Sequence, residues 1–334
     1  MKLRVGTFNL YQFVEPPYAY YTRKGKYNQR QWFEKTLWIK KQILLMDCDI
    51  IGFQEVFSKN ALERLVKELG YEHFVTVDDA KLSETTPNKY TTTTVALASK
   101  YPISNIQSVD VNAPSLEKHH FNDAFAFSRL PIKATILLPN GKALLVYVCH
   151  LKSNRLNVFE YVFKKEDTLA LKKERVFKLL EEKDSKALRQ RLCEASSLFY
   201  DTQSTQDTPT VVMCDLNDKE YSLTIDALTH PAYHDNRSKD TPLLYDANYQ
   251  YKVEVYNPHP EQKKPKRTPT SYFKSTGNVL DYIFISWHFN KENRDKIGTV
   301  TNYQVLDTHL QTHKDGSIIQ SDHAQVVCEL TFDQ

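Results

Sequence analysis

The sequence has no apolar run long enough to cross a membrane or to act as a signal peptide, and Met1 leads straight into a strand-like pattern. It has no Cys-x-x-Cys pair and no Cys/His spacing typical of zinc, and its five cysteines are widely spaced. These absences argue against a disulfide framework and favour a reducing compartment such as the cytoplasm. The alternative is a secreted or periplasmic protein whose signal peptide has been removed.

The net charge is small, and the sequence shows neither repeats nor linkers. The net charge of +3 is too small to indicate a partner by itself. No repeat of fixed period and no linker divides the 334 residues. Because the candidate chemistry described below spans nearly the whole chain, we expect one domain over 1–334, with insertions near 14–31, 77–93 and 230–276. The sequence indicates no protein partner, and we expect a monomer.

Short runs rich in Val, Ile, Phe and Tyr predict strands along the chain. They are Leu3–Leu10, Ile50–Phe53, Thr94–Ala98, Ala124–Leu138, Ala143–Cys149, Thr210–Cys214, Val279–Ile285 and Ala324–Phe332. Helical spacing marks Trp32–Met46, Ala61–Leu69 and a charged stretch, Glu160–Tyr200, that we expect to break at Asp184-Ser185. This mixture, without regular βαβ alternation, predicts an α+β protein with two packed sheets flanked by helices.

Polar side chains stand where several of these strands end. Glu55 follows a short buried strand, and a carboxylate there can bind a hard cation such as magnesium, which prefers oxygen ligands. Asn9 ends the first strand and offers an amide to a metal ligand or a phosphate. The alternative for each is ordinary, because a Glu at a strand end is usually solvated or caps the next helix.

Asp215 and Asn217 follow the strand Thr210–Cys214. Two residues apart on extended chain, their side chains can point the same way. A carboxylate beside an amide suits activation of water next to a bound phosphate. The alternative is an Asx-type turn that closes the strand.

A basic turn follows the strand Ala143–Cys149. His150 comes directly after it, and Lys152, Asn154 and Arg155 are close behind. One imidazole with three cationic or amide donors is a candidate phosphate clamp. A solvated basic turn is the alternative.

Asp281 lies inside the apolar run Val279–Ile285, where an unpaired carboxylate would be costly to bury. We expect His323 to be its partner, because an Asp–His pair fixes the imidazole tautomer and raises its pKa. Asp322 would then point elsewhere and join Glu55 at the metal.

Taken together, these segments resemble the motifs of the endonuclease/exonuclease/phosphatase superfamily, in the family's order and over nearly the whole chain. The matching motifs are Thr-Phe-Asn-Leu at 7–10, Gly-Phe-Gln-Glu-Val at 52–56, Cys-His-Leu-Lys-Ser at 149–153, Cys-Asp-Leu-Asn-Asp at 214–218, Leu-Asp-Tyr-Ile-Phe at 280–284 and Ser-Asp-His at 321–323. The resemblance implies a deoxyribonuclease I-like, four-layer αββα sandwich of two mixed, mainly antiparallel sheets. It also implies a phosphoester hydrolase that depends on Mg²⁺, with Mn²⁺ or Ca²⁺ as alternatives.

The same resemblance implies roles for individual residues. The metal ligands would be Glu55, Asn9 and Asp322. Asp215 would orient or deprotonate the attacking water, Asn217 and His150 would contact the scissile phosphate, and His323, paired with Asp281, would stabilise phosphoryl charge or act as an acid.

The substrate is a separate question, because the fold serves many phosphoesters. The two Trp-containing signatures of inositol phosphatases and the Trp-rich segment of abasic-site endonucleases are absent, and the motif variants look more like bacterial nucleases and related phosphodiesterases. Two insertions interleave cations with aromatic residues, as strand-binding surfaces do. The first runs over Val14–Lys41 and carries Arg23, Lys24, Lys26, Arg30, Lys35, Lys40 and Lys41. The second carries Lys263, Lys264, Lys266 and Arg267.

These insertions favour a nuclease acting on DNA or RNA. The first alternative is a phosphodiesterase or phosphatase acting on a lipid or small phosphoester, with both insertions merely solvated. A more remote alternative is a catalytically inactive binding protein that has kept the fold.

Overall fold

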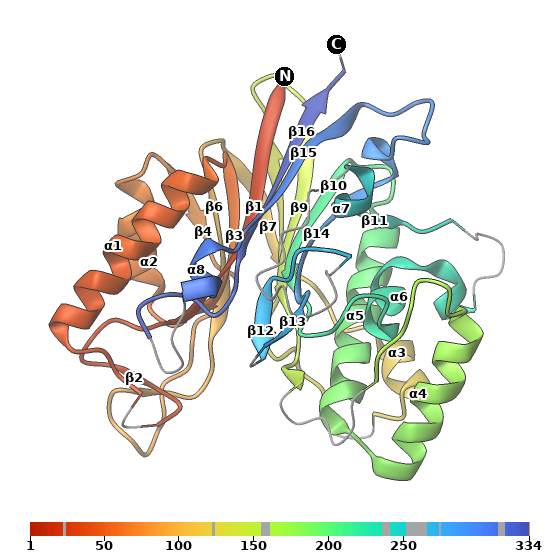
Figure 1. Cartoon of the computed structure of the whole chain (residues 1–334), viewed down its shortest axis with the longest axis horizontal. Coiled ribbons are helices and arrows are strands. Elements are labelled where there is room, and N and C mark those ends of the chain that lie inside the picture. The colour runs from red at the N-terminus through yellow and green to blue at the C-terminus, as the bar shows by residue number, and fades with distance from the viewer. Residues whose placement is uncertain are drawn as a thin grey trace.

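Two six-stranded sheets form the centre of the protein (Figure 1). The computed structural model describes residues 1–22, 25–121, 124–154, 161–235, 241–251, 266–273, 275–312 and 318–333. The first sheet has the order β15-β16-β1-β3-β6-β4, and its strands are β1 (Lys2–Phe13), β3 (Ile50–Val56), β4 (His73–Val75), β6 (Thr94–Ser99), β15 (Gly298–Leu306) and β16 (Gln325–Phe332).

The second sheet has the order β11-β14-β10-β9-β8-β7. Its strands are β7 (Ile103–Ser108), β8 (Ile132–Leu137), β9 (Ala143–His150), β10 (Thr210–Asp215), β11 (Leu244–Asp246) and β14 (Asp281–Ser286). Within these two sheets the pairs β1–β3 and β9–β10 are parallel, and the other neighbours are antiparallel. The expected mixed, mainly antiparallel pairing is confirmed.

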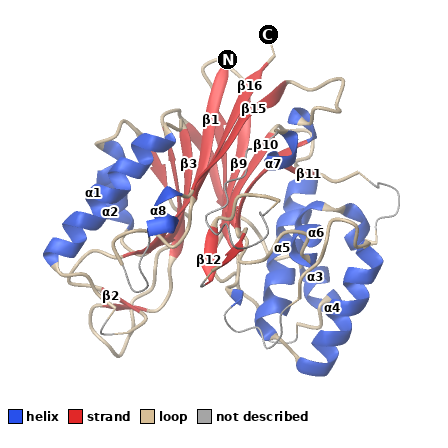
Figure 2. Cartoon of the chain, in the orientation of Figure 1, coloured by secondary structure: helices blue, strands red, loops and turns tan. Residues whose placement is uncertain are grey.

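Helices cover the outer face of each sheet, which gives four layers (Figure 2). On the first sheet lie α1 (Gln29–Met46), α2 (Lys59–Lys67) and α8 (Thr308–Thr312). On the second lie α3 (Ala113–Lys118), α4 (Leu169–Lys183), α5 (Lys186–Ser204) and α6 (Leu223–Thr229). The smaller elements are β2 (Ala19–Tyr20), β5 (Lys89–Tyr90), α7 (Ala247–Gln250), β12 (Ser271–Phe273), β13 (Thr276–Asn278) and two 3₁₀ turns, Pro231–His234 and Trp287–Phe289.

The sheets pack through a core of alternating inward-facing side chains, including Val5 and Ile50 from one sheet and Val146 from the other. At Gly52 they approach very closely. A Cβ there would lie 3.0 Å from both Cγ atoms of Val148 and 3.1 Å from the Met213 Cβ. The lack of a side chain at this position therefore brings the end of β3 close to the ends of β9 and β10.

The expected break at Asp184-Ser185 is confirmed. Asp184 adopts a left-handed conformation (φ 34°) at the end of α4, and the Ser185 hydroxyl accepts a bond from the Leu188 amide to start α5. Two of the expected insertions meet in space, because β2 pairs in parallel with β5.

Two expectations about strands were wrong. The run Ala124–Leu138 contributes a strand only from Ile132, because the segment before it bonds to α5 rather than to a neighbouring strand. The strand β15 was missed, since its polar residues interrupt the apolar pattern. It is nevertheless paired along β16 from Gly298 to Leu306.

All five cysteines are buried free thiols. In the described part of the chain, no helix combines the length and the apolar character that a bilayer crossing would require.

Candidate active site

The strand register brings three of the expected site residues side by side. Asp215, the last residue of β10, lies opposite His150 of β9 and opposite Asp281 of β14. Asn9 reaches across from the first sheet, and its amide donates to Asp215 Oδ2 at 2.9 Å. The polar ends of both sheets therefore converge at one edge of the sandwich.

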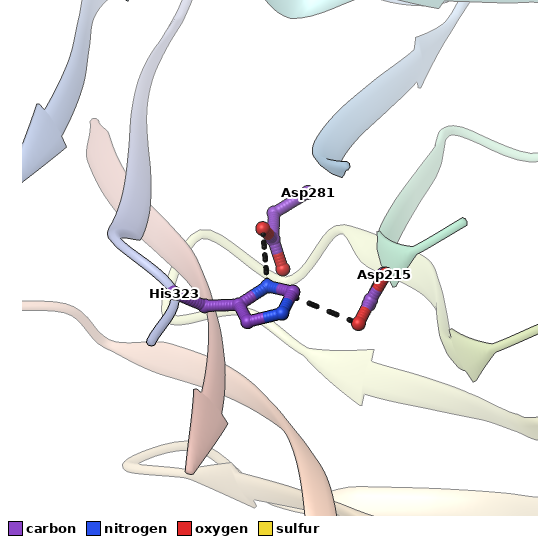
Figure 3. Close-up of side chains that lie close together, drawn as sticks. All are labelled: Asp215, Asp281 and His323. Atoms are coloured by element: carbon purple, nitrogen blue, oxygen red, sulfur yellow. Dashed lines mark hydrogen bonds and ion pairs between the residues drawn. The ribbon is translucent and has the colours of Figure 1, made fainter. Parts of the chain in front are cut away.

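Asp281 and His323 form the expected pair (Figure 3), with 2.8 Å between His323 Nδ1 and Asp281 Oδ2. Ser321 holds this turn in place, because its hydroxyl donates to the Asn9 carbonyl at 2.7 Å and accepts from the His323 amide at 3.0 Å. Burial by itself would lower the pKa of His323, but the charges of Asp281 and Asp215 outweigh it and hold that pKa well above the usual range. The imidazole is therefore a buried cation at neutral pH.

Asp215 is almost fully enclosed, with 1% of its surface exposed. Its Oδ1 accepts from the backbone amide of Asn217 at 2.8 Å. Its Oδ2 lies 3.4 Å from His150 Nε2 and 3.9 Å from His323 Nδ1. Burial and the charge of Asp281 raise the pKa of Asp215 to about 7. A carboxylate with such a pKa is suited to accept a proton near neutrality.

His150 is buried and uncharged. Burial lowers its pKa well below the usual range, and the cationic charges of Arg129 and His323 add to this effect. Its Nδ1 is buried without a hydrogen-bond partner among the described residues. A neutral imidazole at this position can contact a phosphate. Because it carries no charge, it leaves the electrostatic attraction between Asp215 and the His323 cation intact.

Glu55 and Asp322 form a second acidic group at the same edge. Glu55 sits at a left-handed position (φ 58°) near the end of β3, and its Oε2 accepts from the Gln12 amide at 2.8 Å. Burial and then the charge of Asp322 raise the pKa of Glu55. Asp322 Oδ1 is buried without a hydrogen-bond partner among the described residues. Two mutually repelling carboxylates with an unused oxygen fit a hard divalent cation.

A second set of possible ligand atoms lies close by, because Asp215, Asp281 and His323 each offer an atom within 4.8 Å of the others. A ligating imidazole must be neutral, whereas the charges of Asp281 and Asp215 hold the pKa of His323 well above the usual range. Glu55 and Asp322 are therefore the candidate metal ligands. Asn9 is less available than expected, because its amide donates to Asp215 and its oxygen accepts from Tyr11.

We expect Glu55→Gln to weaken Mn²⁺ binding by on the order of 100-fold, the upper end of the cost of losing even an outer-shell partner. The same change should raise Tm in EDTA, because it removes the repulsion with Asp322 that raises the pKa of Glu55. Calorimetric titration with Mn²⁺ and thermal melts measure both effects. The exposed Glu72→Gln is the matched control, and unchanged Mn²⁺ affinity in Glu55→Gln would place the metal elsewhere.

Solved structures share this architecture. The human Nocturnin catalytic domain superposes with a TM-score of 0.58 and 18% identity, over 99% of this chain and 94% of that chain. An AP endonuclease from Archaeoglobus fulgidus superposes with a TM-score of 0.55 and 15% identity, over 99% of this chain and 100% of that chain. An endonuclease/exonuclease/phosphatase family protein from Bacteroides thetaiotaomicron superposes with a TM-score of 0.50 and 15% identity, over 100% of this chain and 99% of that chain.

The chain has the deoxyribonuclease I-like fold that these structures share. No protein-family model and no curated protein sequence matches it. At these identities the likeness concerns the fold, so the site has to be argued from this chain's own residues.

Lys35 is a feature of this site that the sequence did not reveal. It was expected among the solvent-facing cations of an insertion, but it is fully buried on α1. Its Nζ donates to the Tyr11 carbonyl at 2.8 Å. Burial lowers its pKa to about 7, although Asp322 and Glu55 act in the opposite direction. Its spacing from Ile39 and Ile43, one and two helical turns away, was the signal that it faces inward.

The Tyr11 carbonyl belongs to a bulge that contacts two candidate metal ligands, Asn9 and Glu55. Tyr11 and Gln12 both adopt left-handed conformations, with φ of 51° and 61°. This geometry aims the Tyr11 amide at Asn9 and the Gln12 amide at Glu55. Lys35 thus stabilises a strained turn whose two amides orient candidate ligands.

The other residues predicted to contact phosphate or nucleic acid differ in how far they are exposed to solvent. Arg23, Lys24, Arg155, Lys263 and Lys264 lie outside the described residues. Lys152 and Asn154 are partly buried beside the site, and Lys26 is exposed. Arg267 was expected on the surface and is instead buried, with 4% exposed, where it bonds to Asp246 and to the Tyr303 hydroxyl. It is a structural ion pair and not a surface contact.

Arg129 was missed altogether, because it lies in a run interpreted as a strand. Its guanidinium donates to the Leu151 carbonyl at 3.1 Å, and the side-chain amide of Asn217 donates to the same carbonyl at 3.0 Å. Its charge lowers the pKa of both His150 and Glu55. A cation so placed lies at the rim of the candidate site.

Proposed function

We propose that this protein is a divalent-metal-dependent phosphodiesterase that hydrolyses nucleic acid. The observation that carries the proposal is the placement of the hydrogen-bonded His323–Asp281 pair and of Asp215 beside the Glu55–Asp322 acidic pair. A proton acceptor, a buried cation and a candidate metal site at one edge are the parts that hydrolysis of a phosphoester needs.

Each residue has a distinct part in this reaction. A divalent cation, when bound at Glu55 and Asp322, supplies positive charge to the phosphoryl oxygens. Asp215 accepts a proton from the attacking water, whose oxygen forms the new bond to phosphorus as the ester oxygen leaves with the bonding electrons. His323, held by Asp281, stabilises the negative charge that develops on the phosphoryl oxygens.

Two likenesses support nucleic acid as the substrate class. The AP endonuclease is one, and a Danio rerio TDP2, solved with a single-strand DNA product, is another at a TM-score of 0.51 and 12% identity. The Nocturnin structure holds a sulfate anion, a phosphate mimic. The alternative substrate, a small phosphoester, is favoured by the burial of Arg267, which removes one cation from the surface that nucleic acid would need.

A substrate panel tests the proposal. The protein is incubated with Mg²⁺ or Mn²⁺ and with plasmid, linear and single-stranded DNA, RNA, sphingomyelin and bis-p-nitrophenyl phosphate. We expect cleavage of nucleic acid that EDTA abolishes. Turnover of the lipid or the small ester alone would refute the nuclease assignment, and no turnover of any substrate would support the inactive binding protein.

A further inference from the structure

A polar pocket of about 260 Å³ lies next to the candidate active site. Its walls come from four loops and from α5, and they include Thr92, Ser128, Arg129, Lys152 and Gln190. No role in the proposed reaction accounts for this pocket.

The pocket adjoins the candidate active site through Arg129. The guanidinium of Arg129 and the side-chain amide of Asn217 both donate to the Leu151 carbonyl, so one peptide group joins the two places. Lys152 is the next residue along the chain. A group bound between Arg129 and Lys152 would therefore lie beside a phosphate held at Asn217 and His150.

Helix α5 fixes the geometry of the pocket. Glu194, with 1% of its surface exposed, accepts from the Ser128 amide and from the Lys152 amide, each at 2.7 Å. The fully buried Arg191 donates to the Lys152 carbonyl at 3.1 Å. Glu194 thus ties the loop that carries Arg129 to the loop that carries Lys152, and Arg191 adds a second bond to the Lys152 backbone, so the backbone beside both cations is fixed before any ligand binds.

Neither pocket cation forms an ion pair with a carboxylate in the described ranges of the chain. Neighbouring cations on this side of the protein do have acidic partners: Lys172 with Asp226, Arg189 with Asp184, and Arg191 with Asp218. Two cations that form no ion pair in those ranges, at one small polar pocket, attract an anion.

We propose that this pocket binds a second phosphate group of the substrate, next to the phosphate that is cleaved. The proposal rests on the proposed function and narrows it to phosphoesters that carry a neighbouring terminal phosphate. A volume of about 260 Å³ accommodates one phosphate with part of a sugar and is too small for a duplex. The preferred substrate is therefore a strand end or a small bisphosphate rather than an internal duplex site.

Three thymidine dinucleotides test this preference: TpT, which has no terminal phosphate, pTpT and TpTp. We expect kcat/KM for one of the two phosphorylated dinucleotides to exceed that for TpT by about 10-fold or more, as one charge-assisted contact provides. Lys152→Gln and Arg129→Gln should each bring that ratio close to one. Lys178→Gln, an exposed lysine of α4, is the control that should leave the ratio unchanged.

A binding measurement separates this proposal from the proposed function. Thymidine 3′,5′-bisphosphate and thymidine 5′-monophosphate are titrated calorimetrically into wild-type protein and Lys152→Gln. Tighter binding of the bisphosphate by wild type alone supports the second site even if no ester is cleaved. Equal cleavage of the three dinucleotides, or equal binding of the two nucleotides by wild type, overturns it.

Discussion

Asp215→Asn is expected to lower metal-dependent kcat by on the order of 10³-fold, within the range lost with a general base. The amide that replaces the carboxylate cannot accept the proton of the attacking water, although it keeps nearly the same shape among Asn9, Asn217 and His150. Single-turnover cleavage at saturating Mg²⁺ measures the loss. The exposed Asp110→Asn is the control for a carboxylate-to-amide change, and a near-normal rate in Asp215→Asn would remove Asp215 from the mechanism.

The pH dependence of the same variant separates chemistry from folding. The pKa of Asp215 is raised to about 7, so the base is protonated below that pH and wild-type kcat should fall as pH drops through the neutral range. In Asp215→Asn this part of the profile should be flat. A raised carboxyl pKa also means that the folded state binds more protons than the unfolded one, so this group costs stability as pH rises from 4 to 7. The variant should therefore melt no lower than wild type at pH 8.

His323→Ala is expected to have the second largest effect, a loss of on the order of 10³-fold in kcat, comparable to removal of one oxyanion-stabilising donor. It should also lower the free energy of unfolding by about 3 kcal/mol at pH 8, because Asp281 and Asp215 are then buried without their shared cation. Rate measurements and urea denaturation give the two quantities.

Asp281→Asn completes a double-mutant cycle with His323→Ala. If the two residues act as a pair, Asp281→Asn alone lowers kcat, yet it adds little to the loss in His323→Ala. The double variant should also recover most of the lost stability, because the unpaired charge of Asp281 is gone. Strictly additive losses in rate and in stability would show that the bond between them has no functional importance.

Local patterns in the sequence identified most of the elements. Apolar runs and helical spacing predicted the main strands and the break between α4 and α5, because burial on one face imposes a periodicity that can be counted. The same method missed β15, where polar residues lie on the solvent face of an edge strand. It also extended β8 too far, since no local signal shows that Ser128 bonds to Glu194 rather than to a strand.

The pairing of Asp281 with His323 was also predictable. A carboxylate in so apolar a strand is costly to bury without a partner, and the imidazole of His323 can supply the positive charge. The positions of lysines and arginines were much less so. Lys35 and Arg267 carry the same charge as exposed cations nearby, but one supports a strained turn under Glu55 and the other is paired with Asp246. Composition gives the number of charges and says nothing about which of them are neutralised.

The sequence by itself determined most of the strands and helices and the chemical identity of the groups at the strand ends, because these depend on residue type and on spacing along the chain. Tertiary structure alone decided which of those groups meet. It placed Asp322 near enough to Glu55 to raise its pKa, and it set Arg129 beside Asn217, 88 positions away in the chain (217 − 129). The physical reason is that charge coupling and pocket shape depend on distances in space, which follow from how closely the two sheets pack at Gly52.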